Sequence, residues 1–502
     1  MIKKALVANR GEIAVRIIRT LKEMGIITVA VYSEPDRHSL HVRLADEAVA
    51  LKGVLSRETY LDLEKIVRAA KQTNSNAIHP GYGFLSENPE FVSLCESSGI
   101  IFIGPKAEAI SAMGHKTTAR KLMIDAEVPV VPGTSEPIAS QEEAQRIANK
   151  IGFPILIKAK AGGGGKGMRI VKNNENIASS FRQAASEALQ SFGDGDVYIE
   201  KLLSKPRHIE IQIIGDSFGN IYHLCERECS IQRRHQKVIE ETPSVIVDED
   251  MREFMGNLAK RAAKTVGYEG AGTVEFLVDE KRNVYFLEMN TRLQVEHPIT
   301  ESILGLDLVR LQIEVALKKE LSLNQESIKP NGHAIECRIY AEDPENNFMP
   351  SPGLIKTFFP PLGPFVRVDS GVFEGFKVPI QYDPIIAKLI VWDVTRNQAI
   401  ERMKRALAEF KIRGIKTNVQ FMLDVLSTKA FLSGCYDTNF LDNNWPKIKT
   451  QFTKEDLSSD IVIAIAAIAN FRRDEFQRSL SDRMHAAKPP SFWRFIPWKT
   501  LN

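Results

Sequence analysis

The sequence predicts a multidomain protein in which an α/β domain is followed by domains of the α+β class. The chain has 502 residues, more than a single hydrophobic core usually holds, so we expect several domains. Residues 1–114 alternate strand-like and helix-like segments, which indicates a parallel sheet. From residue 115 onward this alternation gives way to hairpins, and after Gly332 to short β-like runs separated by proline-rich turns.

The first domain is predicted to span residues 1–114 and to have a Rossmann-like arrangement. Its first turn, Ala8–Glu12, lacks the pattern G-x-G-x-x-G, and no clear ribose-binding acid follows the second strand. We therefore expect the fold without a dinucleotide site. Apolar runs and helical periodicity place strands at Lys4–Ala8, Ile27–Tyr32 and Ile101–Ile103, and helices at Glu12–Met24 and Leu61–Ala70.

Three further segments follow the first domain. A central domain is predicted at residues 115–330, and a β-rich domain with a helix near Gln398–Phe410 is predicted at residues 331–446. Residues 447–502 form an extension that ends in a sequence rich in aromatic residues and proline. Two interpretations of this end stay open, because it would either dock on a partner or cap the core.

Composition excludes several classes of protein. Hydrophobic residues make up 43% and charged residues 26%, as in ordinary globular proteins, and the formal charge of +3 gives no reason to expect nucleic acid or a membrane surface. Five scattered cysteines complete no zinc site. The N-terminus has no signal-peptide pattern, and the longest apolar run, Ile461–Ala469, is too short to span a bilayer. We expect a cytoplasmic protein.

A glycine-rich loop is the first candidate for a binding site. Four consecutive glycines, Gly162–Gly165, are followed by Lys166 and Gly167, and Lys158 lies on the preceding strand-like run. A strand follows instead of a helix, which argues against a dinucleotide fingerprint, and no Ser or Thr follows Lys166 as a Walker A loop requires. Glycines let backbone N–H groups approach phosphate oxygens. The loop therefore indicates a phosphate cover, and the alternative is a flexible hairpin tip.

A hairpin of acidic residues is the second candidate. The runs Thr273–Asp279 and Val284–Glu288 flank a short polar turn, and pairing Asp279 with Val284 puts Glu275 opposite Glu288. Like charges at facing positions are destabilising unless a cation lies between them. With Asn290 two residues further on, the pattern predicts a magnesium site. The alternative is a solvated pair on a surface hairpin.

The segment Glu288–His297 continues this pattern. Its polar residues fall on every even position, so an extended chain would place five of them on one face. Two carboxylates, two amides and a guanidinium on one strip would hold a metal, an anion and a base together, although a half-exposed strand has the same alternation. Combined with the glycine loop, the strip predicts an ATP-dependent enzyme that is not a P-loop NTPase.

Five motifs together resemble the biotin carboxylase component of biotin-dependent carboxylases, over residues 1 to about 446. The resemblance implies an ATP-grasp central domain with a mobile glycine-flap lid at residues 130–203, and a biotin carboxylase C-terminal domain. It also implies that ATP and bicarbonate carboxylate N1′ of biotin through carboxyphosphate. The motifs are Ala8–Ala14, His79–Asn88, the glycine loop, Gln232–Lys237 and Glu288–His297.

The resemblance assigns a role to each matching residue. ATP would contact Lys116, Lys158, Gly162, Gly163, Gly164, Gly165, Lys166, Gly167, Glu200, Lys201, Leu203, His208, Gln232, His235, Glu275 and Glu288. Magnesium, or manganese, would be held by Glu275, Glu288 and Asn290. Bicarbonate and biotin would be bound by Lys237, Arg292, Gln294, Val295, Arg338 and Tyr82. The catalytic residues would be Glu296, Arg292, Arg338 and Lys237.

The implied chemistry needs these residue types. Bicarbonate becomes a nucleophile only after it loses a proton, which calls for a carboxylate such as Glu296 beside it. The second negative charge then requires cations, which Arg292 and Lys237 would supply. After biotin loses its N1′ proton, its enolate-like oxygen needs a fixed positive charge, and Arg338 matches that position in the family.

Partners are implied by what the sequence lacks. It contains no Ala-Met-Lys-Met tetrapeptide, so biotin would arrive on a separate carrier protein, and a carboxyltransferase would be a separate subunit. The end of the chain is loosely similar to the spacer of acyl-CoA carboxylases, which favours an acyl-CoA acceptor. A two-subunit pyruvate carboxylase stays open as an alternative. The resemblance also implies a homodimer.

Two other functions compete with this interpretation. The first is another ATP-grasp ligase, such as a carbamoyl-phosphate or peptide ligase, which phosphorylates a carboxylate and transfers it to an amine. The second is a non-catalytic ATP-binding scaffold for a carboxylase complex. The intact set Glu275, Glu288, Arg292, Glu296 and Arg338 argues against the scaffold.

Overall fold

The computed structural model describes residues 1–134, 136–159, 168–445 and 466–472. Contacts divide the chain into two compact units, Met1–Trp445 and Pro446–Asn502. The predicted phosphate cover at residues 162–167 lies outside the described residues, as does all of the extension except the helical segment 466–472. Within the described ranges, no helix is long and apolar enough to cross a membrane.

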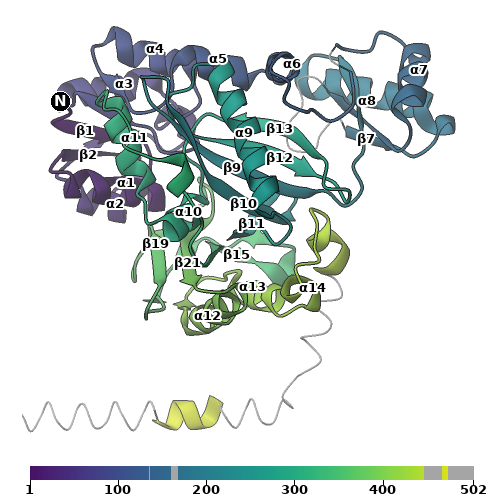
Figure 1. Ribbon diagram of the computed structural model, residues 1–502. Coiled ribbons are helices and arrows are strands. Elements are labelled where there is room, and N and C mark those ends of the chain that lie inside the picture. Colours follow the sequence, from purple (N-terminus) through teal and green to yellow (C-terminus); the bar gives the residue numbers. More distant parts are fainter. Residues whose placement is uncertain (135, 160–167, 446–465, 473–502) are drawn as a thin grey trace, which may run out of the picture. The chain divides into compact units, whose positions relative to one another are not determined.

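The N-terminal residues form the predicted parallel sheet (Figure 1), with strand order β3-β2-β1-β4-β5. The strands and helices predicted here are confirmed to within two residues at each end. Helix α1 buries Ile13, Ile17 and Leu21 in the core beneath the sheet. The elements are β1 (Lys4–Val7), α1 (Gly11–Glu23), β2 (Ile27–Tyr32), α2 (Leu40–Leu44), β3 (Glu47–Ala50), α3 (Leu63–Gln72), β4 (Ala77–His79), α4 (Pro89–Ser97) and β5 (Ile101–Phe102).

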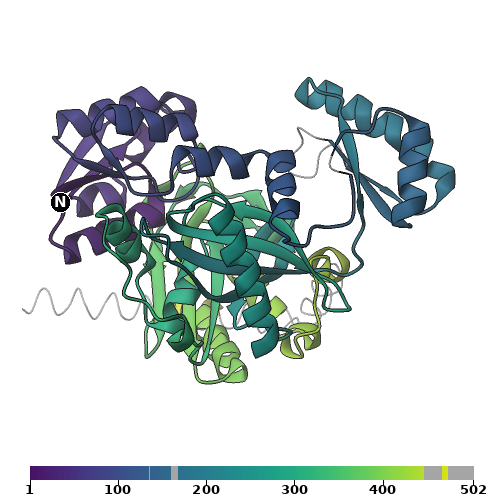
Figure 2. The same cartoon turned by 45° about the horizontal axis from the view of Figure 1, so that its top comes forward.

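A small lobe follows, which is drawn in blue in Figure 2. Two helices, α5 (Ala107–Gly114) and α6 (Lys116–Asp125), lead into it. Its three antiparallel strands have the order β7-β6-β8 and pack through Ile155 and Ile157 against two helices. The two strands predicted on either side of the glycines are thereby confirmed. The elements are α7 (Gln141–Ile151), β6 (Ile155–Ala159), β7 (Met168–Val171), α8 (Ile177–Phe192) and β8 (Val197–Lys201).

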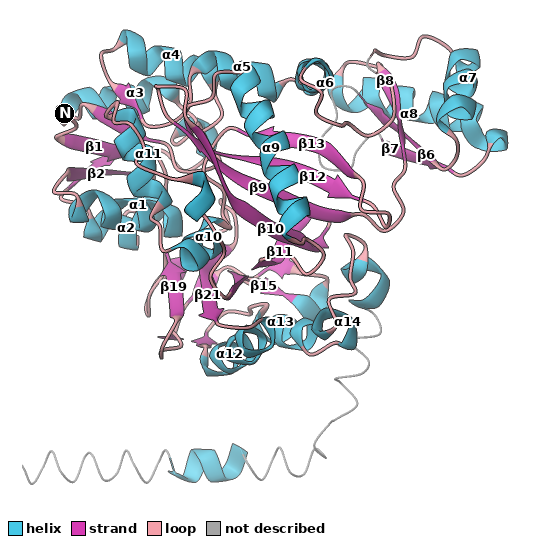
Figure 3. Ribbon diagram, in the orientation of Figure 1, coloured by secondary structure: helices cyan, strands magenta, loops and turns pink. Residues whose placement is uncertain are grey.

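The largest sheet has eight strands, all antiparallel, in the order β13-β12-β9-β10-β11-β14-β21-β19 (Figure 3). It is continuous across the domain boundary predicted between residues 330 and 331, because β11 pairs with β14. Its elements are β9 (Arg207–Gly215), β10 (Ile221–Arg233), β11 (Gln236–Thr242), α9 (Glu249–Thr265), β12 (Gly270–Val278), β13 (Val284–Asn290), α10 (His297–Leu304), α11 (Leu308–Ala316), β14 (His333–Tyr340), β19 (Val366–Ser370) and β21 (Ile385–Asp393).

The remaining elements surround the last strands of this sheet and are β-rich, as predicted, and the predicted helix near Gln398–Phe410 is α12. Short strand pairs are β15 (Glu342–Asp343) with β16 (Met349–Pro350), β17 (Gly353–Leu354) with β20 (Lys377–Val378), and β18 (Thr357–Phe359) with β22 (Lys411–Arg413). The helices are α12 (Arg396–Glu409), α13 (Val419–Leu426) and α14 (Lys429–Leu432).

The acidic hairpin has the predicted carboxylate pair but not the predicted turn. Glu275 pairs with Glu288, whereas the predicted pair of Asp279 with Val284 is wrong because Val284 pairs with Val278. The Asp279 carboxylate instead accepts hydrogen bonds from the backbone of Lys281 and Asn283, which tightens the turn. A register shift beside Glu275 then inserts one residue and restores the facing carboxylates.

The strip Glu288–His297 is not extended over its whole length, so its prediction as one strand is wrong. Strand β13 ends at Asn290, and α10 begins at His297 with Glu296 as its N-cap. Proline at the second helical position favours this start. In the intervening loop, residues 291–296, Gln294 and Glu296 contact strands of the large sheet, whereas Arg292 pairs with Glu87.

Candidate active site

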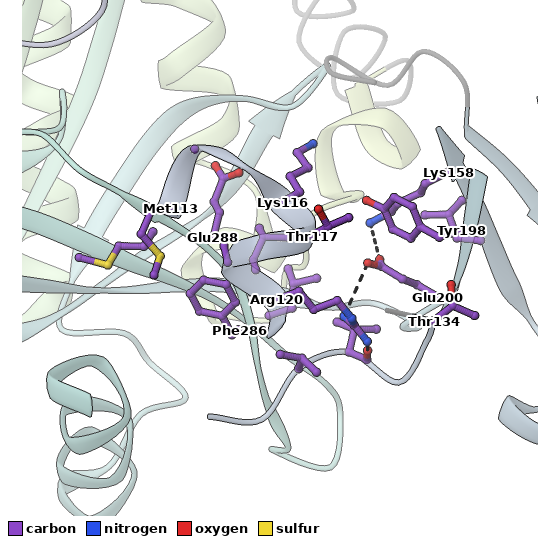
Figure 4. A pocket seen from close by; sticks show the side chains of 18 of the residues that line it. Met113, Lys116, Thr117, Arg120, Thr134, Lys158, Tyr198, Glu200, Phe286 and Glu288 are labelled. Carbon is purple, nitrogen blue, oxygen red and sulfur yellow. Dashed lines mark hydrogen bonds and ion pairs between the residues drawn. The ribbon is translucent and has the colours of Figure 1, made fainter. Parts of the chain in front are cut away.

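A cavity of about 550 Å³ lies between the small lobe and the edge of the large sheet. Figure 4 shows the side chains that reach into it from α6, β6, β8 and β13. Six residues predicted to contact ATP line this cavity: Lys116, Lys158, Glu200, Lys201, Leu203 and Glu288. Apolar walls from Ile110, Met113, Leu156, Phe286 and Leu287 give it room for a planar aromatic ring.

Glu200 lies between two cations in this cavity (Figure 4). Lys158 Nζ forms an ion pair with its carboxylate, and Arg120 Nη1 lies 3.9 Å from it. Burial, followed by the charge of Glu200, raises the pKa of the nearby Tyr198 hydroxyl to about 12, so this tyrosine stays a hydrogen-bond donor. The Lys201 ammonium donates to the carbonyls of Gly152 and Phe153, both at 2.9 Å, and is therefore already engaged.

The facing carboxylates differ in how they are held. Glu275 Oε1 accepts from Lys237, Asn290 and Gln294 at 2.8–2.9 Å, and its Oε2 lies 2.9 Å from His208 Nε2. Glu288 lines the cavity, and no hydrogen bond or ion pair holds its carboxylate among the residues described. The like charge of Glu275, with burial, raises the pKa of Glu288.

This arrangement fits a divalent cation. A carboxylate pair brought into register, with an amide oxygen beside it, presents the hard oxygen donors that magnesium prefers. The ligand atoms of His208, Glu210 and Glu275 also converge closely enough to hold a metal. The Lys237 ammonium already lies between Glu210 and Glu275 at that position. We therefore place the metal ion between Glu275 and Glu288.

Lys237 forms the centre of a second cluster, on β11. Its ammonium contacts three carboxylates, those of Glu210, Glu275 and Glu296, the last at 2.6 Å. Burial alone would lower the pKa of Lys237, but the three carboxylates raise it well above its ordinary value. The residue is therefore a fixed positive charge between the hairpin and Glu296.

Glu296 is held by cations at both oxygens. Lys237 binds Oε1, and Arg338 Nη2 binds Oε2 at 2.9 Å. Burial opposes ionisation, yet Lys237 and Arg338 keep the pKa of Glu296 well below its ordinary value. Arg338, on β14, also binds Glu240, whose pKa is raised to about 7 by burial despite this contact. The predicted base and the predicted biotin-binding arginine are thus in direct contact.

The loop 291–296 carries the remaining predicted anion ligands. Arg292 forms an ion pair with Glu87 at 2.7 Å and donates to Asn290 Oδ1 at 2.9 Å. The Gln294 amide donates to Glu275 and accepts from Arg227. The Val295 carbonyl accepts from Lys388 at 2.9 Å.

The other predicted contacts are more widely distributed. His208 and Gln232 are buried and hydrogen-bonded to each other at 2.9 Å. His235 is exposed, in the β10–β11 turn with φ of 65°, and does not line the cavity. The Tyr82 hydroxyl, predicted to face biotin, donates to Glu12 instead.

Arg227 is the main site residue that the sequence did not single out. It is fully buried on β10 and binds the carboxylate of Glu210. It also donates to Gln212, Thr273, Gln294 and Thr300 at 2.6–3.2 Å. The run Glu226–Glu228, three charges inside an apolar strand, was the available signal.

Comparison with known proteins gives a consistent result along the chain. Residues 1–110 match the family model of the biotin carboxylase N-terminal domain, and residues 336–443 that of the biotin carboxylase C-terminal domain. Residues 115–324 match the model of the carbamoyl-phosphate synthase L chain, ATP binding domain.

Individual proteins agree. The chain is 54% identical to "Biotin carboxylase 1" of Bacillus subtilis over 443 residues, which are 88% of this chain and 98% of that one. It is 46% identical to "2-oxoglutarate carboxylase small subunit" of Hydrogenobacter thermophilus over 471 residues, 94% of this chain and 99% of that one. The crystal structure of the biotin carboxylase domain dimer of the 2-oxoglutarate carboxylase from that organism, with MgADP, ADP and bicarbonate, gives a TM-score of 0.84 at 48% identity, covering 89% of this chain and 98% of that one.

Proposed function

The chain belongs to the biotin carboxylase family, and from that premise we propose how its residues carry out the reaction. The enzyme uses ATP and bicarbonate to carboxylate biotin, the first half-reaction of a biotin-dependent carboxylase. The observation that carries the proposal is the contact of Glu296 with both Lys237 and Arg338, because it puts a base beside two fixed cations.

ATP enters the cavity between the small lobe and the large sheet. Its adenine would lie near Glu200, Lys201 and Leu203, and its phosphates near Lys116 and Lys158. Glu275, Glu288 and Asn290 would hold magnesium, which when bound supplies positive charge to the phosphates.

Bicarbonate binds beside Lys237, Arg292 and the loop that carries Gln294 and Val295. With both oxygens bound by cations, Glu296 is a weak base before the substrate enters. An anion that shares Lys237 and Arg338 takes part of their charge away from the carboxylate, which makes Glu296 more basic at the moment it accepts the bicarbonate proton. The oxygen so activated attacks the γ-phosphorus of ATP, the bond to the bridging oxygen breaks, ADP leaves and carboxyphosphate forms.

Arg338 serves the second part of the reaction. Carboxyphosphate breaks down to CO₂ and phosphate, and the phosphate takes the N1′ proton of the biotin ureido group. Negative charge develops on the ureido oxygen while N1′ attacks the CO₂. Arg338 is fixed by Glu240 at 2.6 Å, so its charge needs no reorganisation when that oxygen forms.

Biotin is supplied on a separate carrier protein, and a carboxyltransferase subunit takes over the carboxyl group. This part of the proposal rests on the relatives that are named as subunits of carboxylases. We also propose a homodimer, as in the Hydrogenobacter structure. The extension 447–502 is proposed as a docking tail for a partner.

The final acceptor is proposed to be a 2-oxo acid. The alignment with the 2-oxoglutarate carboxylase subunit spans 471 residues, 94% of this chain, against 443 residues, 88% of this chain, for the Bacillus enzyme. An acyl-CoA acceptor is the alternative that the end of the sequence favoured. Assays of the reconstituted complex with pyruvate, 2-oxoglutarate, acetyl-CoA and propionyl-CoA distinguish them by which one becomes carboxylated.

ADP release by the purified chain tests the half-reaction. With Mg-ATP, we expect turnover that depends on bicarbonate, rises on addition of free biotin and needs no amine. Arg338→Ala is expected to abolish the stimulation by biotin. Turnover that ignores biotin would favour another ATP-grasp ligase, and its complete absence would favour the scaffold.

A further inference from the structure

Lys388 is a fully buried lysine that none of the roles above uses. It lies on β21, where it pairs with Arg338 of β14, so both side chains are on the face of the sheet that α10 covers. Burying an ammonium is expensive unless several acceptors surround it. Its Nζ donates to the Val295 carbonyl at 2.9 Å and lies 3.3 Å from Glu12 Oε2 and 3.9 Å from Asp369 Oδ2.

Glu12 connects this lysine to the N-terminal domain. It lies in the first turn of α1, and its other oxygen accepts a hydrogen bond from the Tyr82 hydroxyl. Glu12 and Tyr82 belong to the two N-terminal sequence motifs, Ala8–Ala14 and His79–Asn88, that the mechanism leaves without a direct task. A chain of polar contacts therefore runs from Tyr82 through Glu12 and Lys388 to the Val295 carbonyl.

A second set of contacts fixes α1 against the same sheet. Arg10 binds Asp36 through two hydrogen bonds of 2.6 and 2.7 Å, and its guanidinium lies 4.3 Å from the ring centroid of Tyr382, just before β21. Gly371, just after β19, packs so closely that a Cβ there would lie 2.5 Å from the Glu12 nitrogen. Both ends of the contact between Glu12 and Lys388 are therefore held rigidly.

The Val295 carbonyl connects this series of polar contacts to the residues proposed to act in the reaction. Its neighbours in the sequence are Gln294, which binds Glu275, and Glu296, which binds Lys237 and Arg338. Strand β13 has ended and α10 has not begun at Val295, so no regular ladder fixes this loop. A bond from a fixed ammonium to the carbonyl restricts the peptide planes on either side of the residue.

We propose that Lys388 is a positioning residue, which, anchored by Glu12, holds the Val295 carbonyl and so sets the loop that presents Gln294 and Glu296 to bicarbonate. This inference rests on the proposed function, since it assigns bicarbonate to that loop. It gives the N-terminal domain a role in the reaction, because Glu12 supplies the counter-charge that keeps the lysine in place.

Substitution separates positioning from mere stabilisation. Lys388→Met removes the bond to Val295, and the double variant Lys388→Met with Glu12→Gln also removes the buried charge that would be left unpaired. Replacing both members of a buried ion pair commonly restores stability. Arg252→Met is the matched control, because it removes the ion-pair partner of the buried Glu226, and neither of these two side chains forms a hydrogen bond or ion pair with residues 291–296, all of which the structure describes.

The expected result is a rise of about tenfold or more in the KM for bicarbonate in both Lys388 variants, as for a lost charged hydrogen bond. The KM for ATP stays unchanged, and Arg252→Met keeps both constants. A KM for bicarbonate that is unchanged in Lys388→Met, or that recovers with stability in the double variant, overturns the inference.

Amide hydrogen exchange provides a readout that does not depend on turnover. Exchange over residues 291–296 is expected to be faster in the double variant than in the unaltered protein and unchanged in Arg252→Met. If exchange over residues 291–296 is the same in the double variant as in the unaltered protein, Lys388 does not hold the loop through Val295, even if bicarbonate-dependent turnover is present. If the unaltered protein shows no such turnover but exchange is faster in the variant, the proposed function is overturned, while the positioning of the loop by Lys388 is supported.

Discussion

At the scale of single residues, the account depends most on Glu296. Glu296→Gln keeps the shape of the side chain but removes its ability to accept a proton, and we expect bicarbonate-dependent turnover to fall by about 10²–10⁴-fold. Lys237 keeps Glu210 and Glu275, and Arg338 keeps Glu240, so the fold is expected to persist. Steady-state ADP release measures the change, with Glu314→Gln, in a weak surface pair, as the control. Full activity in Glu296→Gln would assign the base elsewhere.

Glu241 provides a test of stability. Its buried carboxylate accepts hydrogen bonds from His333 and Arg396, each at 2.7 Å, and from Tyr436. These three bonds join β11 to β14, to α12 and to the segment after α14. Glu241→Gln breaks this network, so we expect a loss of about 3–5 kcal/mol in the free energy of unfolding at neutral pH. Glu409→Gln, in an exposed pair with Arg405, should change it by less than about 1 kcal/mol.

The same carboxylate predicts a pH dependence. Burial opposes ionisation, but His333 and Arg396 lower the pKa of Glu241 from 4.5 to about 2 in the folded state. Because the folded pKa lies below the unfolded one, the stabilisation is complete above about pH 4.5 and is lost as the pH falls toward 2. The difference in unfolding free energy between the unaltered protein and Glu241→Gln should therefore be smaller at pH 3 than at pH 7. An equal difference at both pH values would refute this assignment.

The sequence predicted which residues belong to the site better than it predicted which residues they contact. The two strands that carry Glu275 and Glu288 follow from local periodicity, but their facing positions also depend on the register shift beside Glu275. Arg227 and Lys388 could not be placed, because each contacts residues more than 60 positions away and reaches them only through the pairing of the large sheet. Tyr82 shows the converse, since its motif was recognised but its hydroxyl bonds to Glu12.

At the scale of elements, the segment that leads into the small lobe pairs with β8. Gly133 forms a bridge with Glu200, Thr134 donates to the Ile199 carbonyl at 2.9 Å, and Lys201 donates to the Pro132 carbonyl at 2.7 Å. A Cβ on Gly133 would lie 2.5 Å from the Ile199 carbonyl oxygen, which is backbone and cannot turn aside.

Gly133→Ala is expected to displace β8 and raise the KM for ATP by about tenfold, as a shift of 1–2 kcal/mol would. The KM for bicarbonate should stay unchanged, because Lys237 and Glu296 lie on other elements. Gly195→Ala is the control within the same lobe, since the nearest atom to its Cβ would be 3.5 Å away. Equal KM values for ATP in the two variants would show that the close packing of Gly133 against β8 does not affect ATP binding.

The hairpin shows why element boundaries are harder to predict than element types. Both strands were predicted, but the Asp279 side chain lies in the turn, so Val278 and not Asp279 pairs with Val284. The register shift beside Glu275 then brings Glu275 opposite Glu288 again. Likewise, the alternating strip after Glu288 reads as a strand until Pro298, whose ring favours the first turn of a helix. Turn chemistry here decides what periodicity alone does not.

At the scale of the whole molecule, the domains are joined by the large sheet. The sheet runs without a break from β13, beside the ATP cavity, to β19, so Lys237 on β11 and Arg338 on β14 occupy neighbouring strands of one framework. The sequence separated these segments at residue 330, since strand pairing between distant segments leaves no local signal. All described site residues lie within Met1–Trp445.

Removal of residues 447–502 is therefore expected to leave the carboxylation of free biotin intact. If the extension is a docking tail, the truncated chain should lose co-elution with the carboxyltransferase subunit, as measured by size-exclusion chromatography of the mixed subunits. Co-elution that is as complete as with the full chain would remove the extension from the assembly and leave the half-reaction untouched.

The central claim is tested most directly by following carbon from bicarbonate to biotin. The full chain is incubated with Mg-ATP, radiolabelled bicarbonate and free biotin, and the acid-labile label on biotin is counted beside the ADP formed. We expect label on biotin in proportion to ADP, and none with Glu296→Gln. ADP that forms without label on biotin, or label that appears only when an amine is added, would contradict the account.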